Sequence, residues 1–561
     1  MSRRLVVAGI IAGAALFGCS PSGTGAPMLP SPALTTGRPL ALASTRGAFL
    51  GRMAGAARVD IYVQLAGRHD DELYALRGRI FTPEAFGRYF GADPAEYARA
   101  VALLRRHGFV IDDLPANRTD VVAHAAAATV EAFFQTPLDL RREKGRVFYA
   151  NRYDPSFPAG LHAVAVSGLD DYGVHHPLLR RSPRAIVNGT FSWGPQDVAT
   201  AYDLLPLYRQ KLDGKGVVIA NATCGAALAS DLALFRKTFS LPAASLVSTA
   251  LPKGHALRTG CGSGRYSYGN TESSLDADWS LAVARGATLH QVVAHGPSNH
   301  EFDLVYSYIV NDLGKTVHIV TTSWGMCERD MRDTPSFRID ERLFAQAAAE
   351  GQRWFAASGD NGTDDCQDGG HAVSVDYPGS SPHVTDVGGT DVQAAIVNGS
   401  VTAWQGETVW QYSNSDGATG GGRSILFKKP PYQSGVTPAD GVRDVPDVAL
   451  IADPVNDGLW MVQAGALQSG WGGTSESAPQ WAGLFAIIEQ RFGDKVIDDP
   501  HNRLYQLAAS SRYHQLFHDV VKGSNGVADA YGTFPGFAAG PGFDLCTGWG
   551  SFIGAELVRA Y

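Results

Sequence analysis

The chain has 561 residues, of which 45% are hydrophobic and 18% are charged, so it is long enough for two or more domains with sizeable cores. Its formal net charge of −8 argues against a nucleic-acid partner. The 64 glycines are typical of a large α/β enzyme with many tight turns rather than of a helical bundle.

The first 19 residues predict an export signal. A basic start, MSRR, precedes the apolar run 5–18, which is too short for a comfortable permanent membrane span. The ending LFGC resembles a bacterial lipobox, in which Cys19 becomes the lipidated first residue; an ordinary cleaved signal is the alternative. Both interpretations predict an exported protein, either a cell-envelope lipoprotein or a secreted one, that touches a membrane only through a lipid anchor. Residues 20–45, rich in Pro, Ser, Gly and Thr, predict a disordered tether.

Residues 46–174 predict a compact α+β domain without an obvious catalytic cluster. Its expected strands are 58–66, 109–114, 119–125 and 145–152, and its expected helices are 82–91, 93–108 and 126–136. Thr82 and the proline after it are typical of a helix start, and Gly108 of a helix end. Residues 175–194 then break the pattern, because they are basic and punctuated by Pro and Gly. They predict an exposed linker that a protease can cut.

The remaining residues, 195–561, alternate apolar strands with helical patterns. The expected strands are 216–222, 288–296, 316–325, 353–360 and 383–392. Continuous apolar strands separated by helices favour a mostly parallel sheet that is covered by helices on both faces. In such sheets the functional residues gather at the carboxyl ends of the strands.

Cysteines can pair outside the cytoplasm. Apart from Cys19 the chain has five, and the sequence alone cannot fix how they connect. The chain has no CxxC pair and no tight Cys/His cluster, which argues against a zinc site. The pairing that we expect is Cys224–Cys261 and Cys327–Cys366, with Cys546 free.

Ser475 is the candidate nucleophile. It follows the glycines of GWGGTS and precedes a long apolar helix, so it lies at a helix amino terminus, where backbone N–H groups and the helix dipole favour a developing oxyanion. The alternative is a serine that only caps the helix.

A serine hydroxyl needs a base, and two acids are spaced to supply one. Glu272 and Asp276 lie i, i+4 on an expected helix that ends near Gly286, so they share one face. Buried together, such carboxyls hold a proton between them, whereas on a solvated face they are only two ordinary acids. A third acid, Asp360, follows an apolar strand, although a turn-forming aspartate in GDNG would look the same.

These three segments together resemble one family. ESSLD at 272–276, ASGDNG at 357–362 and GTSESAP at 473–479 match, in order, the signature of the sedolisins, the serine-carboxyl peptidases, whose kumamolisin-like members carry a long amino-terminal pro-domain. The resemblance covers nearly everything after the tether, including 81–109, 205–220 and 380–390. It implies a subtilisin-like catalytic domain at 195–561, a pro-domain at 46–174 that acts as an intramolecular inhibitor, and an activation linker at 175–194.

The resemblance also implies a role for each acid. Ser475 would be the nucleophile, Glu272 the base, and Asp276 the group that holds Glu272 and shares its proton. Asp360, protonated, would donate a hydrogen bond to the oxyanion beside the N–H of Ser475. An ionised Asp360 would repel that oxyanion, so we expect an acid-active endopeptidase on peptides and proteins.

A calcium loop is implied near the carboxyl terminus. FHDVVKGSNG and AGPGFDLCTGWGS resemble the loop of the family, and carboxylate and carbonyl oxygens suit one Ca²⁺ ion. Its ligands would be Asp519, Val520, Gly540, Gly542 and Asp544. Two residues depart from the usual pattern, Asn361 after Asp360 and Asp278 after the acid pair, and both bear on the substrate pockets.

Two alternative functions are open. A subtilisin-type Ser/His/Asp protease would need a histidine base, typically in an H-G-T-H context. The chain offers VVAHGPSNH instead, in which His295 is followed by Gly-Pro. A catalytically inactive surface-binding lipoprotein would keep the fold without the chemistry. In the peptidase interpretation we expect a monomer whose basic linker and acidic cleft hold the precursor closed until the carboxylates are protonated.

Overall fold

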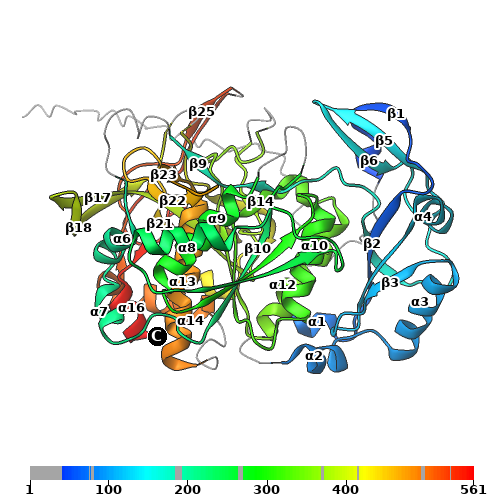
Figure 1. The fold of residues 1–561 in the computed structure, drawn as a ribbon, viewed down its shortest axis with the longest axis horizontal. Coiled ribbons are helices and arrows are strands. Elements are labelled where there is room, and N and C mark those ends of the chain that lie inside the picture. Colours follow the sequence, from blue (N-terminus) through cyan, green and yellow to red (C-terminus); the bar gives the residue numbers. More distant parts are fainter. Residues whose placement is uncertain are drawn as a thin grey trace, which may run out of the picture.

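A computed structural model describes residues 41–74, 76, 81–182, 192–262, 269–367, 372–412, 416–493, 500–530 and 532–561. The predicted signal at 1–19 and all but the last five residues of the predicted tether lie outside these residues. The chain forms a smaller N-terminal domain, which contains the elements from η1 (Ala41–Thr45) to β7 (Ala163–Ser167), beside a larger C-terminal domain, which contains those from α6 (Pro195–Ala201) to α16 (Gly554–Ala560) (Figure 1).

The N-terminal domain contains two antiparallel sheets. One has the strand order β3-β4-β2-β7 and the other β1-β5-β6. The strands are β1 (Ala48–Arg52), β2 (Arg58–Leu65), β3 (Val110–Asp113), β4 (Asp120–Ala126), β5 (Leu138–Glu143), β6 (Arg146–Asn151) and β7 (Ala163–Ser167). The helices are η1 (Ala41–Thr45), α1 (Asp70–Leu73), α2 (Pro83–Tyr89), α3 (Pro94–Arg106) and α4 (Ala127–Phe134). All seven predicted elements of this domain are confirmed, whereas β1, β5 and β7 were not predicted.

Helix caps explain where two of these helices begin. The Thr82 hydroxyl accepts a hydrogen bond from the Ala85 N–H, and the Asp93 carboxylate accepts from the N–H groups of the second and third residues after it. In both helices a proline follows the cap, where its missing N–H costs nothing. The cap chemistry read from the sequence therefore sets these boundaries.

The C-terminal domain is built on an eight-stranded sheet. Its order is β11-β12-β10-β13-β15-β17-β18, and β21 also pairs with β17. All pairings are parallel except that of the β17–β18 hairpin. The strands are β10 (Val218–Cys224), β11 (Ser245–Leu251), β12 (Thr288–Ala294), β13 (Ile319–Thr322), β15 (Arg353–Ala357), β17 (Val384–Val397), β18 (Ser400–Val409) and β21 (Val448–Ile451). The predicted α/β fold with a mostly parallel sheet is confirmed.

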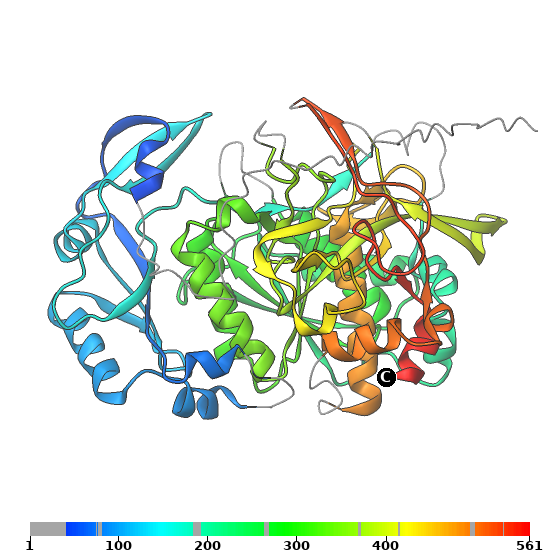
Figure 2. The same cartoon turned by 180° about the vertical axis from the view of Figure 1, so that it is seen from behind.

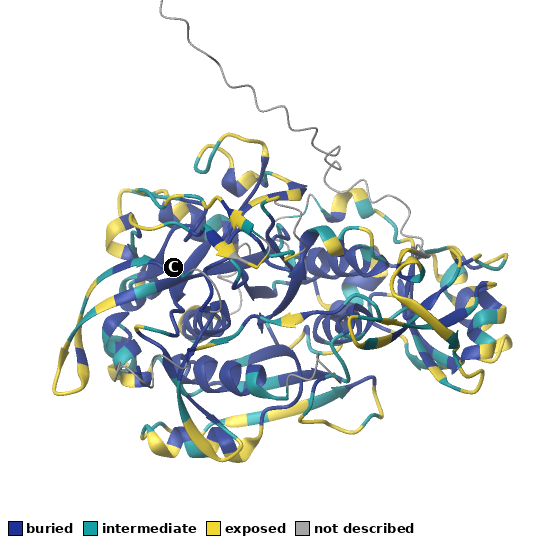
Figure 3. Ribbon diagram, turned by 90° about the horizontal axis from the view of Figure 1, so that it is seen from above, coloured by how far each residue is buried: buried dark blue, intermediate teal, exposed yellow. Residues whose placement is uncertain are grey.

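Helices cover both faces of this sheet. Two neighbouring residues of the central strand β10 point to opposite faces and belong to different hydrophobic cores. Ile219 lies in the core that includes α9 (Thr271–Val283) and α13 (Thr474–Phe492). Ala220 lies in the core that includes α10 (Asn299–Asn311) and α12 (Pro335–Ala349). Figure 3 shows that the buried residues concentrate in the interior of the molecule and the exposed ones at its periphery.

Shorter elements surround the sheet. The helices are α6 (Pro195–Ala201), α7 (Leu205–Arg209), α8 (Ala229–Thr238), α11 (Glu328–Met331), η3 (Pro431–Gln433), α14 (Pro500–Ala508), α15 (Tyr513–Leu516) and α16 (Gly554–Ala560). The strands are β8 (His176–Pro177), β9 (Arg180–Arg181), β14 (Trp324–Cys327), β16 (Asp376–Tyr377), β19 (Gly422–Lys428), β20 (Val442–Val445), β22 (Leu459–Gln463), β23 (Ala466–Gly472), β24 (Phe517–His518), β25 (Val527–Asp529), β26 (Gly532–Phe534) and β27 (Ser551–Phe552). In the described part of the chain, none of the helices is both long and apolar enough to cross a membrane.

The N-terminal domain packs against α10 and α12 (Figure 2). Tyr62, Val122 and Ala165 join the hydrophobic core that these two helices form with the large sheet. Polar contacts flank this apolar patch: Ser167 Oγ lies 2.9 Å from His300 Nδ1, and Arg342 Nη2 lies 3.0 Å from an Asp70 oxygen. The interface is therefore a mixture of buried apolar and hydrogen-bonded surface.

Two disulfides join the predicted cysteines. The bonds are Cys224–Cys261 and Cys327–Cys366, and Cys546 is a buried free thiol. The expected pairing is confirmed.

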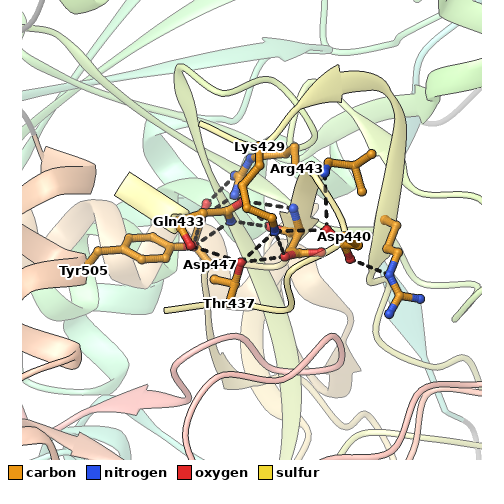
Figure 4. A network of polar contacts seen from close by, with 10 residues as sticks. Lys429, Gln433, Thr437, Asp440, Arg443, Asp447 and Tyr505 are labelled. Carbon is orange, nitrogen blue, oxygen red and sulfur yellow. Dashed lines mark hydrogen bonds and ion pairs between the residues drawn. The ribbon is translucent and has the colours of Figure 1, made fainter. Parts of the chain in front are cut away.

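A buried ion pair holds β20 and β21 against the sheet (Figure 4). Arg443 makes two hydrogen bonds of 2.7 and 2.6 Å to Asp447, which also accepts from the Tyr505 hydroxyl and from the backbone N–H of Asp386 on β17. Burial alone would raise the pKa of Asp447, but the charge and hydrogen bonds of Arg443 outweigh it and lower that pKa. The pair therefore adds stability above the ordinary pKa of an aspartate, and this stability is lost as the pH falls.

Replacing Arg443 by methionine is expected to lower the free energy of unfolding by about 3–5 kcal/mol, because Asp447 would stay buried without its partner. Urea unfolding at pH 7, followed by tryptophan fluorescence, measures the change. The matched control is Arg423→Met, which breaks a pair with Asp440 in which the arginine side chain is 45% exposed. That loss should be about 1 kcal/mol or less. Equal losses of unfolding free energy in the two variants would contradict a stabilising role for the buried Arg443–Asp447 pair.

Candidate active site

The turn between β23 and α13 presents Ser475 from inside the protein. Gly473 is the N-cap of α13, with a φ of 104°, and Ser475 is the second residue of the helix and fully buried. A Cβ on Gly473 would lie 2.6 Å from both an Asp360 carboxylate oxygen and the Leu178 carbonyl oxygen, so only glycine fits here. The interpretation of Ser475 as a simple helix cap is therefore wrong.

Glu272, on α9, reaches the serine. Its Oε2 lies 3.0 Å from Ser475 Oγ, although the two residues are 203 positions apart in the chain. The two helices can approach because α13 carries Gly483, where a Cβ would lie 2.8 Å from the Ser280 carbonyl oxygen of α9. Close packing of α9 on α13 thus brings the carboxyl to the hydroxyl.

Asp276 lies one helical turn beyond Glu272 and is also buried, so the alternative of a solvated pair is wrong. Its two oxygens accept hydrogen bonds from Ser323 Oγ at 2.7 Å and from Asn221 Nδ2 at 3.0 Å. Burial, and then the neighbouring charge of Asp276, raise the pKa of Glu272 well above its ordinary value. Burial likewise raises the pKa of Asp276. Both effects favour retention of a proton by the pair.

Asp360 follows β15, at the carboxyl end of the sheet, as predicted. Its Oδ1 accepts hydrogen bonds from the backbone N–H of Thr474 at 2.8 Å and from the Thr474 hydroxyl at 3.0 Å. Its Oδ2 lies 3.6 Å from Arg180 Nε. Burial raises the pKa of Asp360 to about 6, while the Arg180 charge opposes that rise. The Asp360 carboxyl is thus joined to the same turn that carries Ser475.

Residues 174–182, the cleft segment, run across this site. Within it, β8 pairs antiparallel with β14, and β9 pairs antiparallel with β23. Between these two pairings, the Leu178 N–H donates to the Ser323 carbonyl at 3.0 Å and the Leu178 carbonyl accepts from the Ser475 N–H at 3.0 Å. The Ser475 hydroxyl also contacts this carbonyl oxygen. An extended peptide is therefore bound with one carbonyl group against the serine.

The structure corrects the prediction of an exposed linker over 175–182. Val174, His175, Leu178 and Ser182 are buried, whereas His176 and Arg181 are exposed. Backbone pairing on both sides, which depends on residues more than a hundred positions away, is what buries this segment. Residues 183–191 lie outside the described part of the chain.

A cavity of about 880 Å³ lies along the cleft segment. The N-terminal domain contributes Arg146 and Tyr172 to its lining, and the C-terminal domain contributes Asp360 and Asn361. The other departure from the family pattern, Asp278, does not line it. Asp278 is buried and accepts a hydrogen bond from the Val462 N–H, so it anchors β22.

Histidine is not the partner of the serine. In the part of the chain that the structure describes, no histidine is hydrogen-bonded to Ser475. The His295 ring instead lies with its Nε2 3.1 Å from an Arg258 nitrogen, and the backbone N–H of His295 donates to Glu301. The geometry therefore offers a carboxyl as the only hydrogen-bonded base among the described residues.

Some residues of the site were not singled out in the sequence. Ser323 and Asn221 lie in predicted strands, and their polar side chains among apolar neighbours were the available signal. Glu476 directly follows the serine, is fully buried, and has its pKa raised by burial and then by the charge of Asp360. Its place in GTSES gave no hint that it points inward.

The predicted calcium ligands come together in one loop region. The Gly542 N–H donates to Asp519 at 3.1 Å, and the Gly540 N–H donates to Asp544 at 3.1 Å. No described residue donates a hydrogen bond to the carbonyl oxygens of Val520, Gly540 or Gly542. Burial raises the pKa of Asp544 to about 6. Two carboxylates and three available carbonyls make an all-oxygen donor set that fits Ca²⁺.

Comparison with known proteins places this site in a family. The family described as "Pro-kumamolisin, activation domain" matches residues 55–172, and the family described as "Subtilase family" matches residues 263–532. Sedolisin from Pseudomonas sp. (strain 101) is 30% identical over 585 residues, covering 98% of this chain and 94% of the relative. Kumamolisin from Bacillus sp. (strain MN-32) is 32% identical over 542 residues, covering 91% and 93%.

A solved structure agrees with the sequence relatives. Pseudomonas sedolisin, titled a serine-carboxyl proteinase complexed with two molecules of pseudo-iodotyrostatin, superposes with a TM-score of 0.56 at 29% identity. The match covers 66% of this chain and 98% of that one. The chain therefore belongs to the sedolisin family, with a pro-kumamolisin-type activation domain followed by a subtilisin-like serine-carboxyl peptidase domain.

Proposed function

We propose that the protein is an acid-active endopeptidase, made as a zymogen, that cuts peptide bonds with Ser475 as nucleophile and Glu272 as general base. The observation that carries this proposal is the 3.0 Å contact between Ser475 Oγ and Glu272 Oε2 beside a bound peptide carbonyl. The cleft segment extends on both sides of that carbonyl, which supports cleavage within chains rather than only near their ends.

The first step is attack of the serine oxygen on the carbonyl carbon. Ser475 Oγ forms the new bond while its proton passes to Glu272. Asp276 orients Glu272 and shares the incoming proton, and Ser323 and Asn221 hold Asp276 by hydrogen bonds. The proton then moves to the leaving nitrogen as the C–N bond breaks, and a water molecule releases the acyl group by the reverse proton transfers.

The oxyanion that forms needs donors where the peptide oxygen lies. The Ser475 N–H, 3.0 Å from the Leu178 oxygen, is one donor. Protonated Asp360 is the second, since its Oδ2 faces the same turn. The pKa of Asp360 is raised to about 6, so its acid form is present below that pH and is lost as the pH rises above it. The need for protonated Asp360 therefore favours activity at acid pH.

The precursor is inactive because its own chain fills the cleft. The N-terminal domain acts as the intramolecular inhibitor by holding the cleft segment across Ser475. At neutral pH, Arg180 pairs with ionised Asp360, which then cannot donate to an oxyanion. Protonation of Asp360 at acid pH breaks this pair and completes the site, so acidification starts activation.

Neither alternative function gains support from the geometry. A Ser/His/Asp protease would need a histidine at Ser475, whereas no described histidine is hydrogen-bonded to it and the His295 ring contacts Arg258. An inactive binding lipoprotein would have no reason to bury three acids around a serine, at the cost of desolvating them.

The Ser475→Ala chain is expected to lose at least about 10⁴-fold in hydrolysis of denatured casein at pH 4, since no other group replaces the nucleophile. It should also stay uncut during acid incubation. The control is Ser434→Ala, which removes an exposed serine and should leave both rates unchanged. A Ser475→Ala chain that digests casein like the wild type would remove the peptidase mechanism.

Asp360→Asn tests the protonated acid. Asparagine keeps a donor but cannot ionise, so the loss of self-cleavage that centres near pH 6 in the wild type should disappear. Asp360→Ala, which has no donor, should be about 10²–10³-fold slower at pH 4. Initial self-cleavage rates of the full-length chains between pH 3 and 8 provide the comparison. An unchanged pH profile in Asp360→Asn would show that another group sets it.

We also propose that one Ca²⁺ ion is held by Asp519, Asp544 and the carbonyls of Val520, Gly540 and Gly542. The ion would supply positive charge that ties the two loops together near the carboxyl terminus. Its role is structural, because none of these residues is hydrogen-bonded to Ser475, Glu272 or Asp360.

Calcium should stabilise the Ser475→Ala chain against thermal unfolding, by about 2.7 kcal/mol at 100 times the dissociation constant. Asp544→Asn in that background should abolish the gain. Melting curves in CaCl₂ and in EDTA measure it, and Asp71→Asn controls for loss of one exposed carboxylate. A full calcium-dependent gain in the Asp544→Asn chain would rule this site out.

The site of action is proposed to be outside the cytoplasm. Two disulfides support an oxidising compartment. The export signal and lipidation at Cys19 stay predictions from the sequence, as does the monomeric state.

A further inference from the structure

The cleft segment fixes which peptide bond faces the nucleophile. Hydrogen bonds hold its main chain at the Leu178 N–H, at the Leu178 carbonyl and at the Ser182 N–H, which donates to Gly470 at 3.0 Å. His176 and Pro177 lie opposite β14 before this carbonyl, and Arg180 and Arg181 lie opposite β23 after it. The carbonyl of Leu178 is thus the one in position for attack.

Side chains on both sides of this bond are also held. The Leu178 side chain belongs to the apolar core of the C-terminal domain and is 5% exposed. Beyond the bond, Arg180 Nη2 donates to the Asp360 carbonyl at 3.2 Å and to the Asn361 side-chain oxygen. Asn361 is itself fixed by Gln367, whose amide donates to the same oxygen at 2.6 Å.

Arginine is well suited to this position. Its planar guanidinium reaches the Asp360 backbone carbonyl and the Asn361 amide oxygen at once, which a lysine ammonium on a flexible stem cannot do in the same fixed geometry. The next residue, Arg181, places its guanidinium 4.9 Å from the ring centre of Trp471, a cation–π contact. Asn361, which departs from the family pattern, is the side chain that faces this first arginine.

We propose that Leu178–Leu179 is the first bond that the enzyme cuts in its own chain, and that the Asn361 side chain and the Asp360 backbone carbonyl form a subsite that selects arginine two residues after the cut. This inference rests on the proposed function. Ser475 Oγ bonds to the Leu178 carbon, the bond to the Leu179 nitrogen breaks, and that nitrogen takes the proton from Glu272. One water molecule then yields the free Leu178 carboxylate and restores the serine.

The first test is the position of the cut. The full-length wild-type chain, purified at pH 7 and shifted to pH 4, is quenched at early times and analysed by intact mass and amino-terminal sequencing. The first new amino terminus is expected to read LRRSP, beginning at Leu179. A different first terminus, in a preparation that still digests casein at pH 4, would overturn the bond assignment and leave the proposed function intact.

The second test separates recognition from folding, because it uses peptides and the acid-processed enzyme. His-Pro-Leu-Leu-Arg-Arg and His-Pro-Leu-Leu-Ala-Arg, each between a fluorophore and a quencher, differ only at the subsite. We expect kcat/KM to be at least about 10-fold higher for the arginine peptide, because the alanine peptide lacks the charged group that makes these hydrogen bonds. Asn361→Ala should lower this ratio. The two enzymes and two peptides form a double-mutant cycle, which separates the Asn361–arginine interaction from any general loss of activity.

Equal kcat/KM values for the two peptides, or a ratio that Asn361→Ala does not change, would overturn the arginine subsite. Arg180→Ala in the full-length chain should slow the first cut, whereas Arg105→Ala, on the exposed face of α3, should not. Failure of the wild type to cut its chain, casein or either peptide would instead overturn the proposed function, and the subsite with it.

Discussion

The removal of water from a group of acids is the condition on which the whole site depends. Glu272, Asp276, Asp360 and Glu476 are each at most 2% exposed, and after burial the charges of the neighbouring acids further raise the pKa of Glu272 and of Glu476. In water such groups would be ionised and nearly independent. In a dry site the charged forms are penalised, so protons stay on carboxyls and can be passed or shared. In the proposed mechanism, the hydroxyl of Ser475 would thereby gain a base and an oxyanion donor of the same chemical type.

The fold creates this dryness by close helix packing. The α9 and α13 helices approach closely where α13 has a glycine, and both are buried in one core with the large sheet. The carboxyl end of β15 brings Asp360 to the start of α13, while β14 and β23 bind the cleft segment by antiparallel strand pairing. Glu272, Asp276 and Ser475 therefore lie on helices and Asp360 follows a strand, which explains how residues up to 203 positions apart can meet.

The sequence predicted the elements better than their assembly. Local signals, such as the Thr82 cap and the apolar run of β10, depend on neighbours in the chain and were read correctly. The motifs around Glu272, Asp360 and Ser475 were found because each has a recognisable local pattern. The spatial link between them came from a family resemblance and not from spacing.

What the sequence missed depends on distant partners. The cleft segment was expected to be exposed because it is basic and contains prolines, and nothing local reveals that β14 and β23 pair with it. The inward direction of Glu476 has the same cause, since a glutamate on the first turn of a helix is usually solvated. Ser323 and Asn221 were counted only as strand residues, although they hold Asp276.

The way in which the N-terminal domain is attached has a further consequence. If one bond in the cleft segment breaks, residues up to Leu178 remain joined to that domain, whose contacts with α10 and α12 do not involve the broken bond. The newly formed carboxyl end then stays tethered at the active serine like a retained product. Bond scission and the appearance of an open enzyme are consequently separate events, and the lag between them is governed by how fast the two domains part.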